Sequence, residues 1–217
     1  MTTTAQYASV ARNGAAQVST ANTNRDGTGT LALVLQAGAT GARVDGIAVQ
    51  ATGTTTAGML RFYLTKGRPL GAIASITYVT TTATVTTTLN HGLTTGQLVT
   101  VIGCLPDEYN VSEVAVTVTA ATTFTYTMSI APTTNATLVG SGATTTATPT
   151  NRLFRELTVS AITPSATVVA YSATLGTQNA ADKIYFPLVL QAGWSLRAST
   201  EKAETFNIIP TMAGDFS

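Results

Sequence analysis

MLRFYL, residues 59–64, and RLFREL, residues 152–157, are the two stretches of sequence that decide how this chain is organised. In the first stretch Leu60, Phe62 and Leu64 alternate with Met59, Arg61 and Tyr63. This period of two is typical of a β-strand with one buried face. The second stretch has the same mixture of large aliphatic, aromatic and arginine side chains. We therefore predict that they are the arms of one hairpin, with residues 70–150 inserted at its tip, because loop tips tolerate insertions.

The sequence between the two arms differs in composition from the sequence outside them. It is rich in threonine, nearly free of charge and made of short alternating runs, of which YNVSEVAVTVTAATTFTYTMS, residues 109–129, is the clearest. It then fades into TTNATLVGSGATTTATPTN, residues 133–151. We interpret this segment as a Gly/Ser/Thr/Pro linker, because it has no core-forming residue after Val139. Aromatic and large aliphatic residues return together at Arg152.

The composition of the whole chain predicts an all-β protein. Threonine makes up about a fifth of the 217 residues, and its β-branched side chain suits strands and is costly in helices. No stretch predicts an α-helix longer than one turn, the best candidate being NAADKIYF at residues 179–186. The predicted fold is a jelly-roll-like β-sandwich interrupted by an inserted small Ig-like β-sandwich.

We expect three parts along the chain. Residues 1–15 are small and polar and are predicted to form an extended N-terminal arm that orders only against a neighbour. Residues 16–70 and 151–217 together form the discontinuous jelly-roll-like domain, of about eight strands in two packed sheets. Residues 71–150 form the inserted Ig-like domain with its linker.

Two shorter features belong to the outer domain. The stretch AQVSTANTNRDGTGTLALVLQAG, residues 16–38, has an Asn/Asp/Gly-rich break at residues 22–27, which predicts a hairpin between two strands. The hexapeptide LVLQAG occurs at residues 33–38 and again at residues 188–193. Because the sequences around the two copies do not align, we interpret it as a shared strand-and-turn solution and not as a true repeat.

Charge and cysteine content exclude several classes of function. Only 10% of the residues are charged, the net charge is +1, and lysine and arginine form no cluster, so nucleic acid is not expected as a partner. No apolar run is long enough to span a bilayer, so no membrane association is expected. The N-terminus lacks the hydrophobic segment of a secretion signal, and a single cysteine can form no internal disulfide.

The only histidine and the only cysteine lie in NHGLTTGQLVTVIGC, residues 90–104. We predict that His91 has a turn role, in which its side chain bonds nearby backbone, and that Cys104 is a small core or rim residue. A metal site needs several clustered ligands, a nucleophile needs a base, and a glycosidase needs two facing carboxylates. The ten acidic residues are scattered, mostly in turns. We therefore expect no catalytic, cofactor or metal site and no enzyme activity.

Four residues are candidates for contact with another subunit: Arg61, Arg152, Arg155 and Trp194. The three arginines lie near the predicted hairpin, where cross-strand ion pairs are the first interpretation and subunit contact the second. For Trp194, the only tryptophan, packing in the core or between sheets is the first interpretation and subunit contact the second.

Two parts of the chain resemble known phage proteins. Over residues 73–130, the insert has a His-Gly-Leu turn, a glycine before a strand, an asparagine after an aromatic residue and a closing Phe-Thr-Tyr. In these features it resembles the small Ig-like modules that decorate many tailed-phage virion proteins. The outer part, through QVSTANTNRDGTGT, RVDGIAVQATGTTTAGMLRFYL, RLFRELTVSAITPSATVVAY and LQAGWSLRASTEKAETFNIIPTMAGDF, resembles a family of short proteins encoded among phage and prophage structural genes. Members of that family run from the first hairpin arm to the second through a short turn, whereas this chain carries the insert.

The resemblance implies a structural role in a virion and a jelly-roll-like fold. We expect the protein to be made in the host cytoplasm and to lie on the surface of the particle, on the head. The first hypothesis is a capsid decoration (cement) protein that forms a homo-oligomer, with a trimer favoured, and bridges neighbouring copies of the major capsid protein. The alternative is a tail, neck, baseplate or fibre-attachment protein with tail or neck proteins as partners. A third hypothesis is a carbohydrate-binding adhesin. Weak glycan binding by the insert also stays open, although no aromatic stripe supports it.

Overall fold

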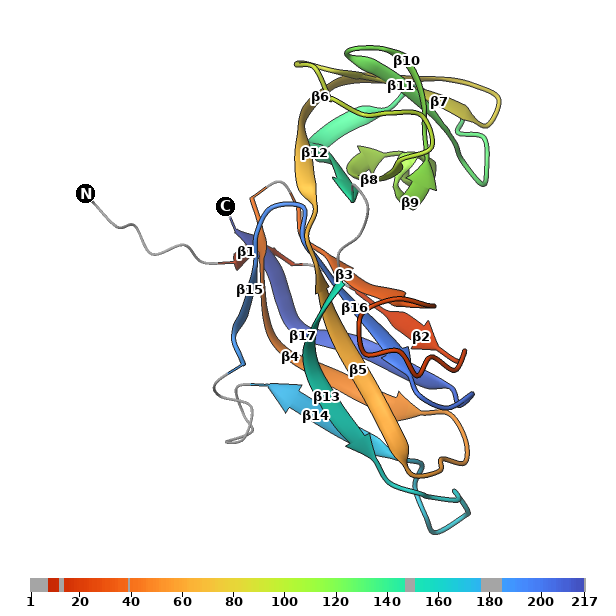
Figure 1. The fold of residues 1–217 in the computed structure, drawn as a ribbon. Coiled ribbons are helices and arrows are strands. Elements are labelled where there is room, and N and C mark those ends of the chain that lie inside the picture. Colours follow the sequence, from red (N-terminus) through yellow and green to blue (C-terminus); the bar gives the residue numbers. More distant parts are fainter. Residues whose placement is uncertain (1–7, 12–13, 39, 147–150, 177–184, 217) are drawn as a thin grey trace, which may run out of the picture. The chain divides into compact units, whose positions relative to one another are not determined.

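The chain is all-β throughout the part that its computed structural model describes, which is residues 8–11, 14–38, 40–146, 151–176 and 185–216 (Figure 1). This confirms the predicted fold class. Within those ranges the only helix is the single 3-10 turn at Asp107–Tyr109, and no helix there could cross a membrane. The chain divides into two compact units: Met1–Lys66 with Thr150–Ser217, and Gly67–Pro149.

Two antiparallel sheets form the first unit. One has the order β1/β2–β17–β4–β14/β15, in which two short strands share each outer position, and the other has the order β13–β5–β16–β3. The strands of the first sheet are β1 (Ala8–Ala11), β2 (Ala16–Val18), β4 (Ala42–Ala51), β14 (Ser172–Gly176), β15 (Leu188–Leu190) and β17 (Phe206–Phe216). Those of the second are β3 (Ala32–Gln36), β5 (Gly58–Thr65), β13 (Asn151–Val159) and β16 (Ser195–Thr200).

The two sheets share one hydrophobic core. Val49 of β4 and Ile208 of β17 belong to the same cluster of buried side chains as Phe62 of β5 and Leu196 of β16, and each of the four is at most 2% exposed. Full burial of one such side chain contributes about 1.5–3 kcal/mol. Since the chain has one cysteine, which is free, packing and backbone pairing hold the sandwich together.

The pairing of β5 with β13 confirms the predicted hairpin. Thr65 lies opposite Asn151 and Arg61 lies opposite Glu156, with one bulge between Leu153 and Arg155. The two strands are neighbours in the sheet although the whole second unit, Gly67–Pro149, separates them in sequence.

The chain crosses repeatedly between the two sheets of the first unit. The chain passes from β2 in the first sheet to β3 in the second, then to β4 in the first and β5 in the second. From β13 in the second sheet it returns to β14 and β15 in the first, crosses to β16 and ends with β17. Strands that are neighbours within a sheet therefore come from distant parts of the sequence.

The second unit has a core of its own. Its strands are β6 (Arg68–Val79), β7 (Thr82–Thr87), β8 (Leu98–Leu105), β9 (Val111–Ala115), β10 (Thr117–Ala120), β11 (Thr123–Thr127) and β12 (Thr137–Thr146), in the order β10–β11–β7–β6–β12–β8–β9. The first part of β6 pairs with β12 and its second part with β7, so β6 joins two groups of strands. Phe124 and Tyr126 from one group are buried in one cluster with Val99 and Val101 from the other.

The prediction of a linker at residues 133–151 is wrong for most of its length. Residues 137–146 form β12, which pairs with β6 on one side and with β8 on the other. A strand between two neighbours has its backbone hydrogen bonds satisfied on both sides, and threonine favours strands. Large apolar side chains are therefore not required for a strand at this place.

Two other expectations about the N-terminal region need correction. The strands on either side of residues 22–27 do not form a hairpin, because β2 pairs with β17 and β3 pairs with β16. Within the predicted arm, Ala8–Ala11 form β1 and pair with the end of β17 in the same chain. The rest of the predicted arm at residues 1–7, 12 and 13, and residues 179–184 of the helix candidate, lie outside the described residues.

The β5–β13 pairing predicts that the first unit folds without the second. Replacing residues 66–150 by Asn-Gly, a two-residue turn suited to a hairpin, should leave a β-sheet circular dichroism spectrum and a cooperative thermal transition. Expressed alone, residues 67–149 should fold as well, because they have a separate core. A shortened chain that shows no cooperative transition would contradict the interrupted-domain interpretation.

Candidate functional site

The second sheet of the first unit carries a buried polar layer on its outer face. Along β5 the core residues Leu60 and Phe62 alternate with Arg61 and Tyr63, which are also buried. All six residues of β16 are buried, and Ser199 lies opposite Arg61. A sheet buried on both faces requires a cover on its outer side. Here a loop from the same chain supplies it.

That cover is the segment of residues 19–31 between β2 and β3, which we name the docked loop. The backbone N–H of Asn22 donates to the carbonyl oxygen of Thr200 at 2.8 Å. Arg61 Nη1 donates to the Asn22 carbonyl at 3.1 Å, and the Tyr63 hydroxyl donates to the Asn24 carbonyl at 2.8 Å. At its tip, Asn151 Nδ2 donates to the carbonyl oxygen of Gly27 at 2.6 Å. The loop is therefore anchored at three successive points.

Short polar side chains give the docked loop its shape. Asn22 Oδ1 accepts from the backbone N–H of Asn24, and Asp26 Oδ1 accepts from the N–H of Thr28, both at 3.0 Å. The hydrogen bonds from the Thr28 hydroxyl and N–H lower the pKa of Asp26. Gly27 has φ +84°, and a Cβ there would overlap Asn151, so only glycine fits this turn.

The spacing Asn22, Asn24, Asp26, Gly27 is one that calcium loops use to place oxygen ligands. In this structure Asn22 Nδ2 donates to the carbonyl oxygens of Thr28 and Thr30 at 2.9 and 3.0 Å. The side-chain amide of Asn22 is thus hydrogen-bonded to the two backbone carbonyl oxygens that a bound cation would need as ligands. Among the described residues no group of three His, Cys, Asp or Glu side chains could hold a metal ion.

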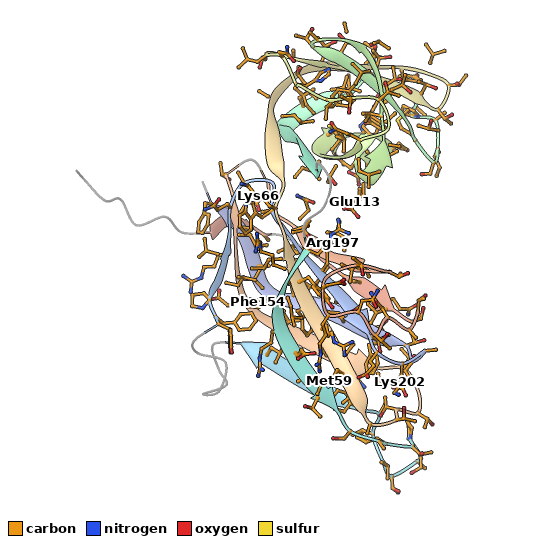
Figure 2. All side chains as sticks on the ribbon, viewed as in Figure 1. Met59, Lys66, Glu113, Phe154, Arg197 and Lys202 are labelled. Atoms are coloured by element: carbon orange, nitrogen blue, oxygen red, sulfur yellow. The ribbon has the colours of Figure 1, made fainter. Side chains whose placement is uncertain are left out.

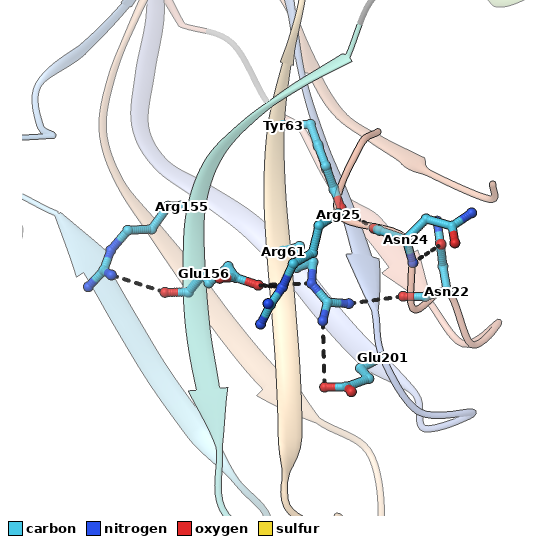
Figure 3. A network of polar contacts seen from close by, with 8 residues as sticks. All are labelled: Asn22, Asn24, Arg25, Arg61, Tyr63, Arg155, Glu156 and Glu201. Atoms are coloured by element: carbon cyan, nitrogen blue, oxygen red, sulfur yellow. Dashed lines mark hydrogen bonds and ion pairs between the residues drawn. The ribbon is translucent and has the colours of Figure 1, made fainter. Parts of the chain in front are cut away.

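Arg61 is the centre of the charged network beneath the loop (Figure 3). Its Nε donates to Glu156 Oε1 at 2.9 Å, and its Nη2 lies 3.7 Å from Glu201 Oε2. The same oxygen of Glu156 accepts from Nε of Arg25, a loop residue, at 3.0 Å. The Arg61 side chain is 3% exposed and that of Arg25 is 63% exposed. A buried guanidinium needs such partners, because an unpaired buried charge is strongly destabilising.

Glu156 responds to this environment. Its partial burial alone would raise the pKa, but the hydrogen bond from Arg61 and the charge of Arg25 outweigh that effect, so the pKa of Glu156 lies below its ordinary value. The carboxylate is therefore charged at neutral pH and links the loop to the sheet.

The four candidate subunit-contact residues have different surroundings. Arg61 is buried, and its guanidinium pairs with Glu156 of the opposite strand and with the Asn22 carbonyl, which is the cross-strand ion pair of the first interpretation. Arg155 donates to the Glu156 carbonyl at 3.0 Å and lies over the Tyr185 ring at 5.1 Å. Arg152 is exposed. Trp194 is half-buried and packs against the core of the first unit.

The two copies of LVLQAG end at turns that meet each other, which the sequence did not predict. The N–H of Ala37 donates to the Trp194 carbonyl at 2.8 Å, and the N–H of Gly193 donates to the Gly38 carbonyl at 3.3 Å. Gln36 Nε2 donates to the Gly193 carbonyl at 2.6 Å. The repeated hexapeptide is the sequence feature that marks both turns.

Three aromatic side chains pack together beside Arg155. Phe154 of β13 (Figure 2) meets the rings of Tyr185 and Phe186 edge-on, with centroids 5.8 and 6.1 Å apart. Arg155 and Phe154 thus both contact the segment before β15, from neighbouring positions on one strand.

His91 has a turn role of the kind predicted. It is 1% exposed, its Nδ1 accepts from the N–H of Leu93 at 3.0 Å, and its Nε2 lies 3.0 Å from the Ala120 carbonyl. Because Nδ1 is an acceptor, the neutral ring carries its hydrogen on Nε2 and donates it to Ala120. The left-handed conformation belongs to Gly92, at φ +57°, and not to His91.

Cys104 is a core residue of the second unit, as predicted. It is 1% exposed, and burial raises the pKa of its thiol to about 11. A thiol with so high a pKa is an unreactive nucleophile. Tyr109 and Tyr126 are buried as well, the hydroxyl of Tyr126 donating to the Tyr109 carbonyl at 2.6 Å. These tyrosines form no exposed aromatic platform.

The polar layer anchors the docked loop to the second sheet. Its charged atoms are engaged with each other and with backbone, and a hollow beside the loop is lined by uncharged side chains: Gln17, Val18, Ser19, Thr20, Thr30, Ala32 and Ser199.

Comparison with protein-family models, with curated proteins and with solved structures finds no match to this chain.

The Arg61–Glu156 pair predicts a loss of stability in Glu156→Gln. The substitution removes the charge that faces buried Arg61, so the free energy of unfolding should fall by about 2 kcal/mol at neutral pH. Urea titration followed by the fluorescence of Trp194, which packs on the same core, measures it. Arg25→Ala is the matched control and should cost less than about 1 kcal/mol, because Arg25 is exposed.

The same pair predicts a pH dependence. Because the pKa of Glu156 is lower in the folded chain than its ordinary value of 4.5, its contribution to stability is present above that value and is lost as the pH falls through the folded-state pKa. The difference between wild type and Glu156→Gln should therefore shrink in acid. A difference that stays constant down to the acid transition would mean that Glu156 and Arg61 do not interact as described.

His91→Ala should weaken the second unit alone. It leaves the Leu93 N–H and the Ala120 carbonyl without their partner, which should cost about 2–3 kcal/mol. Hydrogen exchange of the amides in residues 67–149, measured by mass spectrometry, should speed up, while Thr94→Ala, an exposed position in the same loop, should leave it unchanged. Equal exchange in the two variants would contradict the role given to His91.

Proposed function

We propose that this chain is a non-enzymatic structural protein of a tailed-phage particle, and specifically a capsid decoration protein that forms homo-oligomers on the head and bridges the major capsid protein. The proposal rests on the resemblance of both parts of the sequence to phage structural proteins. Three features of the fold support it.

The strand order of the first unit is the observation that carries the proposal. The eight strand positions can be lettered in chain order from B (β2) to I (β17), with β14 and β15 sharing the letter G. The two sheets then have the strand orders B-I-D-G and C-H-E-F. This order is consistent with a jelly roll, an eight-stranded double sheet built from two Greek keys. We infer that the first unit is the jelly-roll-like domain that the resemblance implies.

The position of the second unit agrees with the same proposal. It interrupts the chain between β5 and β13, where the proteins that the outer part resembles have a short turn. Its two groups of strands around one core are consistent with an Ig-like module. We infer that the module is an accessory carried on a structural domain.

The second unit also presents a broad uncharged face. Thr117, Thr125, Thr84 and Thr77 lie in one cross-strand row over four neighbouring strands. No charged residue occurs in β7, β10 or β11. Surfaces without charge can be buried without the cost of desolvating ions, which suits a protein that packs closely in an ordered array.

The tail, neck or baseplate alternative rests on the same resemblance and differs in the number of copies. A free carbohydrate-binding adhesin is less well supported, because the tyrosines of the second unit that could stack on sugars are buried or packed against its core.

The copy number per purified virion tests the proposal. Quantitative mass spectrometry against the major capsid protein should give on the order of hundreds of copies, as icosahedral repetition requires. A count of about a dozen would favour the tail, neck or baseplate, where rotational symmetry is low. No copies would refute a virion role.

A further inference from the structure

The edges of the first unit differ in how well they are protected. A sheet edge exposes a row of N–H and C=O groups that can pair with another chain, and proteins guard such edges with charges, bulges, proline or a covering segment. The outer strands here are β13 and β3 in one sheet, and β1/β2 and β14/β15 in the other.

Both edges of the second sheet are guarded. β13 has a bulge between Leu153 and Arg155, exposed Arg152, and a carbonyl at Thr158 that accepts from the Tyr171 hydroxyl at 2.7 Å. At the other edge Gly14 lies so close to β3 that a Cβ on it would overlap the carbonyl oxygen of Val34. Gly14 therefore lies directly against this edge.

Three of the outer strands in the first sheet are short. β2 and β15 have three residues each, and β1 has four with a shift of register between Ala8 and Val10. Strands of this length offer little for another chain to pair with.

β14 differs from all of these strands. Its five residues, Ser172–Gly176, include no charge and no proline, and their register with β4 runs without a bulge. In the part of the chain that the structure describes, β14 pairs with β4 alone. Ser172 and Thr174 are exposed on it.

The surface beside Ser172 and Thr174 is also uncharged, and the Arg43–Asp45 ion pair of β4 lies beyond Gly46, which is opposite Gly176. Thr174 lies opposite Ala48 of β4, which lies opposite Ile209 of β17, and Ile209 is 49% exposed. In the next row Ser172 lies opposite Gln50, which lies opposite Asn207. Two copies of this surface can approach each other without bringing like charges together.

We propose that β14 is an open sheet edge at which a second copy of the chain adds its own β14. The two strands run antiparallel about a two-fold axis, so the first sheet continues from one molecule into the next. Such a contact is isologous, which means that the same residues serve on both sides, and it uses the strand-addition mode of recognition. Five residues on each side form a small interface, so pairing in solution is weak and depends on concentration.

Introduced cysteines test this contact in the full chain. In an antiparallel pair, opposite Cα atoms are about 4.5–5.5 Å apart, which is within reach of a disulfide. Thr174→Cys or Ser172→Cys, depending on where the axis passes, should form disulfide-linked dimers under mild oxidation at high concentration. Thr158→Cys, an exposed position on guarded β13, is the matched control and should form far fewer. The native Cys104 is buried and does not compete.

A charge on the edge tests the same contact without cross-linking. Sedimentation should show that the wild-type chain dimerises with concentration. Thr174→Lys should raise the dissociation constant at least about tenfold, because both paired strands then carry the same charge. Thr158→Lys should leave it unchanged. A wild-type chain that stays monomeric, an equal effect of both lysines, or equal cross-linking of the control would overturn the proposal.

The inference does not depend on where the protein acts. A chain that pairs through β14 but is absent from virions would satisfy this test and fail the copy-number measurement, and the reverse result is equally distinct. Within a shell, a two-fold contact of this kind would link the homo-oligomers to one another.

Discussion

The pairing of β5 with β13 is the constraint on which the first unit depends. It joins the two parts of an interrupted domain, since the residues that face each other at its end, Thr65 and Asn151, are 86 positions apart in sequence. The same register sets Glu156 against Arg61. Without that register, the guanidinium that anchors the docked loop would be a buried charge without its nearest carboxylate.

The docked loop shows how a sandwich can bury polar side chains at acceptable cost. Arg61, Tyr63 and Asn151 each donate to a different backbone carbonyl of the loop, at Asn22, Asn24 and Gly27 respectively. These carbonyls would otherwise face water. In the docked position they accept hydrogen bonds from the sheet, and the loop covers the outer face of the sheet. The result is a sheet with one face on the hydrophobic core and the other face on a layer of directed hydrogen bonds.

Sequence reasoning found the elements that depend on local pattern. The alternation in MLRFYL and the similar composition of RLFREL were enough to pair β5 with β13. The single histidine and cysteine were correctly placed in a turn and in a core. It failed where the outcome depends on distant partners. Residues 137–146 look like a linker because they have no large side chain after Val139, yet strands on both sides hold them as β12. The break at residues 22–27 looks like a hairpin turn, yet each flanking strand finds a partner in the C-terminal part of the chain. The burial of Arg61 could not be predicted from the sequence, because residues 19–31 cover it. That loop is held in place by side chains of β5 and β13, which are distant from it in sequence.

The interruption between β5 and β13 has a consequence for the order in which the chain folds. Bringing two strand ends together across a long flexible segment costs entropy that grows with the length of that segment, by about 0.6 kcal/mol for each doubling. The segment here is not a flexible coil, because Gly67–Pro149 has a hydrophobic core of its own. The first and last strands of the second unit, β6 and β12, are hydrogen-bonded neighbours. Folding of that unit therefore brings the two ends of the interruption together. A folded second unit therefore lowers the entropy cost of pairing β5 with β13, compared with a flexible segment of the same length.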